Sequence, residues 1–184
     1  MGSEMCIRDK DSTGGRSSAD RLQQALTQIR QENHGLTILT RPEELRPYEC
    51  DGLSAFRKTP SAVVLPDDRK QIARILKACH AHAVPVVARG AGTGLAAGAL
   101  PIEDGLLLSL ARFNRILEID LDNRLARVEP GVRNLAISEA VRPQGLYYAP
   151  DPSSQIACSI GGNVAENSGG VHCLKYGLTA NNVI

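Results

Sequence analysis

The chain has 184 residues, a length at which a single domain buries roughly 70% of its unfolded surface and needs no disulfide or metal to support its core. Its 21 basic and 20 acidic side chains leave a formal net charge of +1, without a run of like charges, which argues against a nucleic-acid-binding face. Five scattered cysteines without a CxxC pair argue against a disulfide framework and a zinc knuckle, and they favour a reducing compartment.

The two ends of the sequence look different from its middle. Residues 1–18 show no apolar periodicity and end in a Gly/Ser-rich stretch, so they are interpreted as a non-native or disordered leader. The last residues, "TANNVI", resemble the beginning of a strand. We therefore expect the chain to be the N-terminal fragment of a longer protein.

The first predicted element is an amphipathic helix. Apolar side chains from Leu22 to Ile29 follow helical spacing, Ser18 or Asp20 is placed to cap the amino end, and Gly35 is placed to end the helix. A short strand, "LTIL", comes next. A buried strand, "AVVL", and a second helix opened by Pro66 and Asp67 follow. The predicted apolar face of that second helix comprises Ile72, Ile75, Leu76 and Cys79.

A glycine-rich loop follows the next predicted strand. The strand "VPVVA" leads directly into "RGAGTGLAAG", Arg89 to Gly98. Beyond it, "GLLLSL", "ILEID" and "RLARVEP" are predicted strands, the last two joined as a hairpin. A short helix then ends near Gly145. Helices mixed with both crossover and hairpin-linked strands predict an α+β fold.

The loop matches the GxGxx(G/A) pattern of a Rossmann nucleotide site, but its context does not. That site needs a helix to begin inside the glycines, so that its amide-rich end faces the pyrophosphate. Here the loop continues as "GALPIEDG", whose glycines and proline disfavour a helix. We expect instead an anion nest of consecutive backbone N–H groups, with Arg89 adding a charge-assisted hydrogen bond. The alternative is a plain surface turn.

A second glycine-rich segment, Pro150 to Gly170, lies about 60 residues further on, and the two segments are spaced to hold one long anionic ligand. Here the sequence resembles the FAD-linked oxidases of the vanillyl-alcohol-oxidase type. The segments that carry the resemblance are "YECDGLSAF", "PVVARGAGTGL", "VEPGV", "YAPDPSS" and "CSIGGNVAENSGGVHCLKYG". Within that family the chain is most similar to the FAD-linked subunits of bacterial glycolate oxidases.

The resemblance implies which residues hold FAD, bound noncovalently. Around the pyrophosphate it implies Arg89, Gly90, Ala91, Gly92, Thr93, Gly94 and Gly98. Along the rest of the cofactor it implies Pro150, Asp151, Cys158, Ser159, Gly161, Gly162, Asn163, Ala165, Asn167, Gly169 and Gly170. It implies no metal site and no catalytic residue in this chain, because base and substrate-carboxylate ligands belong to the family's C-terminal substrate domain, which we expect to be absent.

The implied fold is an α+β FAD-binding domain of the vanillyl-alcohol-oxidase type, made of two subdomains and truncated at its C-terminus. A helical lead-in would span residues 19–56, and the incomplete FAD-binding domain residues 57–184, with the first subdomain running to about 110 and the second from about 111. FAD would lie between the subdomains.

The implied enzyme is an FAD-dependent oxidoreductase that passes hydride from the CH–OH group of glycolate or D-lactate to FAD. The alternatives are a D-lactate or D-2-hydroxyglutarate dehydrogenase of the same family, or an inactive truncated flavin-binding module. The resemblance also implies a second flavoprotein subunit and an iron–sulfur subunit as partners, and a cytoplasmic location, peripheral at the inner face of the membrane.

Several other side chains that could be reactive are expected to have structural roles. Cys158 and Cys173 are expected to be buried packing residues, since no activating base lies near them in the sequence. His172 is assigned a structural role rather than a covalent bond to flavin. Glu166 is expected to be solvated or hydrogen-bonded.

Overall fold

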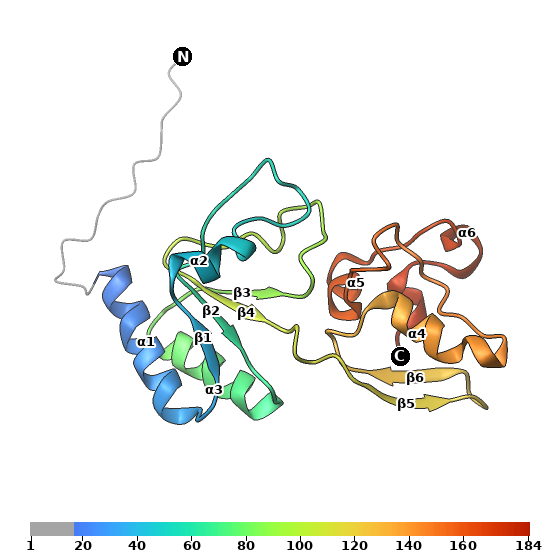
Figure 1. Cartoon of the computed structure of the whole chain (residues 1–184), viewed down its shortest axis with the longest axis horizontal. Coiled ribbons are helices and arrows are strands. Elements are labelled where there is room, and N and C mark those ends of the chain that lie inside the picture. The colour runs from blue at the N-terminus through green and yellow to red at the C-terminus, as the bar shows by residue number, and fades with distance from the viewer. Residues whose placement is uncertain (1–16) are drawn as a thin grey trace, which may run out of the picture.

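The computed structural model describes residues 17–184, which form two lobes (Figure 1). The predicted leader lies outside the described residues up to position 16, but its last two residues belong to the fold. Ser17 caps helix α1 (Ser18–Glu32) by accepting a hydrogen bond from the backbone N–H of Asp20. The cap is therefore Ser17 and not Ser18 or Asp20, because Asp20 completes a capping box from inside the first turn.

The first lobe is a four-stranded sheet with helices on both faces. After α1 its elements are β1 (Thr37–Leu39), α2 (Pro42–Leu45), a 3₁₀ turn (Arg46–Tyr48), β2 (Ala62–Leu65), α3 (Arg69–Ala81), β3 (Val86–Arg89) and β4 (Leu106–Ser109). The strand order is β1-β2-β4-β3, with β1 antiparallel to β2 and the other pairs parallel. The two crossovers place the carboxyl ends of β2, β3 and β4 at one edge of the sheet.

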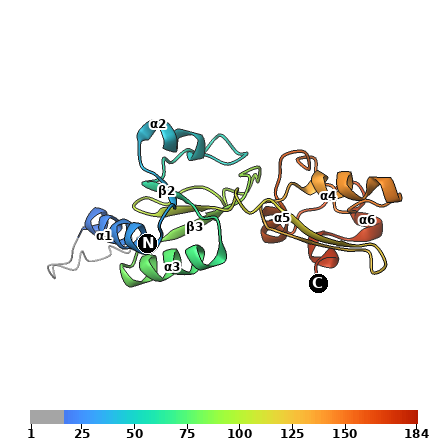
Figure 2. The ribbon, with the colours of Figure 1, turned by 60° about the horizontal axis from the view of Figure 1, so that its bottom comes forward.

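The central strands are buried on both faces, which explains why they read as continuous apolar runs. On one face Val64 and Leu106 pack against α1 and α3, where Leu26, Ile29 and Ile75 are fully buried. On the other face a smaller cluster, Leu45, Val63 and Leu107, is covered by α2. Figure 2 shows α1 and α3 on one side of the sheet and α2 on the other.

Helix α3 begins later than the sequence predicts. Asp68 is its N-cap, and the Asp68 carboxylate accepts the backbone N–H of Gln71, so Pro66 and Asp67 precede the helix. The buried face of α3 also differs from the predicted one. Leu76 is 44% exposed, and Ala78 is fully buried on the inward face instead.

The second lobe has one hairpin and several short helices. Its elements are β5 (Ile116–Asp120), β6 (Leu125–Val128), α4 (Asn134–Val141), a 3₁₀ turn (Arg142–Gln144), α5 (Ile160–Glu166), α6 (Cys173–Tyr176) and a second 3₁₀ turn (Thr179–Asn182). The predicted hairpin is confirmed, and Gly145 ends the α4 region at a φ of 72°. Within the described residues no helix is long and apolar enough to cross a membrane.

Two elements of this lobe differ from the sequence prediction. The segment "TANN" forms a 3₁₀ turn rather than a strand, because Thr179 is fully buried and donates both its N–H and its hydroxyl to the Ser168 carbonyl. The second glycine-rich segment contains helix α5, capped by Ser159, whose hydroxyl accepts from Gly162 N–H. Two consecutive glycines in its first turn hid this helix from periodicity arguments.

Candidate functional site

The glycine-rich loop begins where β3 ends, at the edge of the sheet that faces the second lobe (Figure 1). Residues 90–105 contain turns and bends but no helix, so the expected departure from a Rossmann site is confirmed. Gly92 has a φ of +70°, a left-handed conformation that side chains rarely adopt. The loop therefore presents backbone rather than side chains toward the second lobe.

The loop and the second lobe enclose a cavity of about 410 Å³. Thirteen of the residues expected to hold the cofactor line this cavity: Arg89, Gly90, Ala91, Gly92, Thr93, Gly94, Gly98, Cys158, Ser159, Gly161, Gly162, Asn163 and Ala165. Five others do not line it: Pro150, Asp151, Asn167, Gly169 and Gly170. The residues that sequence reasoning did not assign to the site are Ala88, Ala99, Leu110, Pro130, Ser154, Glu166 and Ser168.

The backbone N–H groups of the loop are free. In the part of the chain that the structure describes, none of the N–H groups from Gly90 to Ala99 donates a hydrogen bond. From the outside the loop is held by Gly52, whose N–H donates to the Gly94 carbonyl at 2.9 Å. A row of unpaired amides facing a cavity is the arrangement that binds an anion without a helix dipole.

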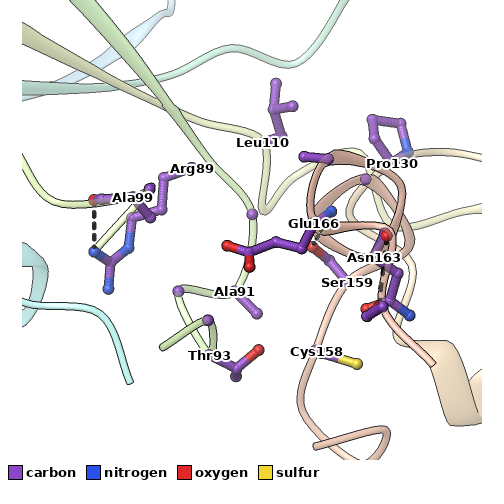
Figure 3. A pocket seen from close by; sticks show the side chains of 18 of the residues that line it. Arg89, Ala91, Thr93, Ala99, Leu110, Pro130, Cys158, Ser159, Asn163 and Glu166 are labelled. Atoms are coloured by element: carbon purple, nitrogen blue, oxygen red, sulfur yellow. Dashed lines mark hydrogen bonds between the residues drawn. The ribbon is translucent and has the colours of Figure 1, made fainter. Parts of the chain in front are cut away.

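The missing Cβ atoms let the two lobes come close. A Cβ at Gly90 would overlap the Ser159 hydroxyl, and a Cβ at Gly94 would lie 2.6 Å from Oε1 of Glu166. Both partners come from the second lobe, one from the N-cap of α5 and one from its last turn. Figure 3 shows Ser159 and Glu166 directed toward the loop. The glycines thus leave the loop amides accessible and also allow the two lobes to come into contact.

Asn163 is a buried donor without a partner. It lies on α5, is 3% exposed and lines the cavity (Figure 3). Its backbone N–H donates to the Ser159 carbonyl and its carbonyl accepts from the Ser168 N–H, but its side-chain Nδ2 has no acceptor among residues 17–184. A buried N–H₂ group left unpaired costs roughly 1–3 kcal/mol. Such a group beside a cavity fits a ligand that brings an acceptor oxygen or nitrogen.

The Arg89 side chain supports the glycine-rich loop through hydrogen bonds to backbone carbonyls. Its guanidinium donates to the carbonyls of Cys50 at 2.8 Å and Ala99 at 3.3 Å, and it lies over the ring of Tyr48 at 5.7 Å. Only 7% of the residue is exposed, and this burial lowers the pKa of the guanidinium. The sequence predicted an anion ligand here. The structure gives the side chain another role, because backbone carbonyls already occupy its N–H groups.

Glycines of the second segment mainly make room for backbone. A Cβ at Gly161 would lie 2.8 Å from the Cβ of Pro130, and one at Gly170 would overlap the Asp151 carbonyl. The amides at the start of α5 are also occupied, since Ile160 and Gly161 donate to the carbonyls of Val132 and Pro130. This segment therefore supplies a wall and the Asn163 side chain rather than a second amide nest.

The remaining reactive side chains lie around this wall. His172 Nδ1 lies 2.6 Å from Asp151 Oδ2. Cys158 is buried as expected, but Cys173 is exposed, because α6 lies on the surface of the lobe with the neighbouring Leu174 98% exposed. Among the described residues no cluster of His, Cys, Asp and Glu is suited to a metal ion.

An FAD-sized dinucleotide fits the chemistry of these residues. The free loop amides match a diphosphate, the orphaned Asn163 Nδ2 matches an acceptor, and a Cβ at Gly94 would fill part of the cradle beside Glu166. The cavity is lined by residues of both lobes.

Curated relatives align with most of this chain. The glycolate oxidase subunit GlcD of Escherichia coli K12 is 65% identical over 159 residues, which are 86% of this chain and 32% of that protein. GlcD of Bacillus subtilis is 47% identical over 137 residues, covering 74% of this chain and 29% of the relative. A D-2-hydroxyglutarate dehydrogenase of Xanthomonas citri is 35% identical over 151 residues. The chain spans about a third of the length of the curated relatives that it matches.

Solved structures share the fold. A 4-ethylphenol oxidase from Gulosibacter chungangensis superimposes with a TM-score of 0.72 at 27% identity, over 84% of this chain and 30% of that one. p-Cresol methylhydroxylase gives 0.67 at 22% identity, over 81% and 30%. This likeness, with the mixture of helices and strands in both lobes, confirms the predicted α+β fold class. A family model described as "FAD binding domain" matches residues 60–184, and the chain belongs to that family.

Proposed function

We propose that the chain is the FAD-binding part of a 2-hydroxy-acid dehydrogenase, of the kind represented by the FAD-linked subunit of glycolate oxidase. One observation carries this proposal in the structure: the loop from Gly90 to Gly94, whose N–H groups donate no hydrogen bond within residues 17–184, lines a cavity that the second lobe also lines. The two GlcD relatives, at 65% and 47% identity, support the choice of enzyme.

In this proposal FAD binds noncovalently between the lobes. The amides of residues 90–94 bind its diphosphate, and Asn163 Nδ2 donates to a further acceptor of the cofactor. Arg89 keeps the loop in its open shape by holding the Cys50 and Ala99 carbonyls. Leu110, Pro130 and Ser154 complete the walls that exclude water from the cofactor.

The bound flavin supplies a hydride acceptor for the α-carbon of glycolate or D-lactate, which becomes a 2-oxo acid when the hydroxyl proton also leaves. The role of this chain is to hold and orient that acceptor. We place the base and the substrate-carboxylate ligands in a separate substrate domain, and we assign no catalytic residue here. A second flavoprotein subunit and an iron–sulfur subunit would receive the electrons, at the cytoplasmic face of the membrane.

A second candidate is a D-lactate or D-2-hydroxyglutarate dehydrogenase. It is favoured by relatives of those names, which are 34% and 35% identical over 143 and 151 residues. The higher identity to the GlcD subunits ranks glycolate first.

Titration with FAD tests the proposal. The purified chain should bind FAD with quenching of the flavin fluorescence, and FAD at one hundred times its dissociation constant should stabilise the fold by about 2.7 kcal/mol. A chimera that joins this chain to the C-terminal two thirds of the E. coli relative should bleach under anaerobic conditions with glycolate. Bleaching only with D-2-hydroxyglutarate would select the second candidate, and absence of FAD binding would reject both.

A further inference from the structure

Among the described residues, 17–184, Glu166 is the one carboxylate that lines the cavity. It is the last residue of α5, and its side chain crosses from the second lobe to the glycine-rich loop (Figure 3). A Cβ at Gly94 would lie 2.6 Å from Oε1 of Glu166, and a Cβ at Gly98 would lie 3.5 Å from the same atom. The carboxylate therefore rests against the part of the loop whose amides are free.

No cation neutralises this carboxylate. In the part of the chain that the structure describes, Glu166 makes no hydrogen bond and no ion pair. Arg89 is the only cation that lines the cavity, and its guanidinium is turned to the carbonyls of Tyr48, Cys50 and Ala99. The negative charge of Glu166 thus acts on the cavity without compensation from its walls.

We propose that Glu166 sets the affinity of the chain for its cofactor by opposing the negative charge of the diphosphate. The inference rests on the proposed function, because it assumes that the glycine-rich loop binds the FAD diphosphate. Two like charges at one loop repel each other, and because the Glu166 side chain is exposed to solvent, the repulsion is screened by salt. Glu166 is then an affinity-determining residue, which makes cofactor binding weaker and more reversible than the free amides alone would give.

Glu166→Gln tests this, because glutamine keeps the size and hydrogen-bonding reach of the side chain and removes its charge. The full chain and the variant are titrated with FAD by fluorescence quenching, at about 20 mM and about 500 mM NaCl. We expect the variant to bind FAD about fivefold more tightly at low salt. We expect the difference to shrink below about twofold at high salt, where the Debye length falls to a few ångström.

Glu139→Gln is the matched control. It makes the same change of charge in the same lobe, on a side chain that lies 3.5 Å from Arg133 and does not line the cavity. FAD affinity of this variant should stay within twofold of the parent chain. An equal gain in both variants would mean that net charge matters and not the position of Glu166, and would overturn the inference.

The other outcomes are equally informative. Unchanged or weaker FAD binding by Glu166→Gln overturns the inference, and weaker binding would mean that the carboxylate accepts a hydrogen bond from a sugar hydroxyl of the cofactor. If Gly92→Val leaves FAD affinity unchanged while the parent chain binds FAD, the assignment of the diphosphate to the loop is wrong, and the inference fails with it. Absence of FAD binding by every chain rejects the proposed function itself.

Discussion

The two glycine-rich segments have similar compositions but different structural roles. In the first, residues 89–98, the N–H groups from Gly90 onward donate to nothing within residues 17–184. In the second, residues 150–170, several N–H groups are bound, and an added Cβ at Gly161 or Gly170 would crowd Pro130 or overlap the Asp151 carbonyl. Glycine therefore exposes backbone to a ligand in one segment and permits close packing in the other.

The positions of the segments in the fold explain the difference. The first segment follows β3, at the edge of a sheet that packs on a well-buried apolar core. In the neighbouring strand β4, Leu106 and Leu107 are each 1% exposed. The second runs through a lobe with a smaller apolar core, where Asn134 is fully buried and donates to the Pro150 carbonyl. Backbone contacts therefore contribute part of the stabilisation of the second lobe, whereas apolar packing provides it in the first lobe.

The largest effect is expected from Gly170→Ala. The new Cβ overlaps the carbonyl of Asp151, and since both are backbone positions the chain must shift. We expect a loss of about 3 kcal/mol in the free energy of unfolding, measured by urea denaturation. Gly162→Ala is the control, because its Cβ would meet only the Ser159 hydroxyl at 3.3 Å. Equal losses in the two variants would contradict a packing role specific to Gly170.

Gly92→Val should act on the ligand more than on the fold. It places a branched side chain at a φ of +70°, where the new Cβ overlaps the guanidinium of Arg89 that supports the loop, so the loop must shift and we expect FAD affinity to fall more than tenfold in a fluorescence titration. Gly145→Val is matched to it, since Gly145 has a φ of +72° and no atom within 4 Å of the added Cβ. The same backbone strain there should leave FAD affinity unchanged. A parallel loss would trace the effect to strain.

Asn163→Leu separates a ligand contact from a packing role within the second segment. The change removes a buried donor that has no partner, so the ligand-free chain should keep or slightly gain stability. FAD affinity should fall by about fivefold, which corresponds to one neutral hydrogen bond. Calorimetric titration with FAD measures the affinity, and thermal unfolding of the same samples measures the stability of the ligand-free chain. A large loss of stability without FAD would show that Nδ2 is satisfied in solution.

The smallest effect concerns the support of the second segment. Glu129 precedes Pro130, on which Gly161 packs, and a hydrogen bond from Arg115 holds the pKa of the Glu129 carboxyl below its usual value. A lowered pKa in the folded state means that the contribution of this pair is present above about pH 4.5 and is lost as the pH falls. The melting temperature of the Glu129→Gln variant should therefore fall less steeply than that of the parent chain as the pH is lowered from about 5 to about 3. Identical slopes would show that other carboxylates dominate.

Sequence reasoning predicted the first lobe better than the second. The strand "AVVL" and the existence of the helix with Ile75 and Cys79 were predicted correctly, because apolar periodicity is a local signal, although the predicted first residue of that helix was too early. Helix α5 was missed, since Gly161 and Gly162 lower its helix propensity and its formation depends on Ser159 and on the carbonyls of Val132 and Pro130. Tertiary contacts thus override propensity in the lobe with fewer apolar contacts.

The sequence by itself determined that a glycine-rich loop follows a strand and is not continued by a helix, because strand periodicity, glycine and proline act locally. Only the tertiary structure decided which side chains meet that loop. Arg89 turns to the Cys50 and Ala99 carbonyls and Glu166 reaches Gly94 because the crossover and the second lobe bring distant segments together. Whether a glycine faces a ligand or a neighbouring backbone depends on such partners, and residue type alone does not specify them.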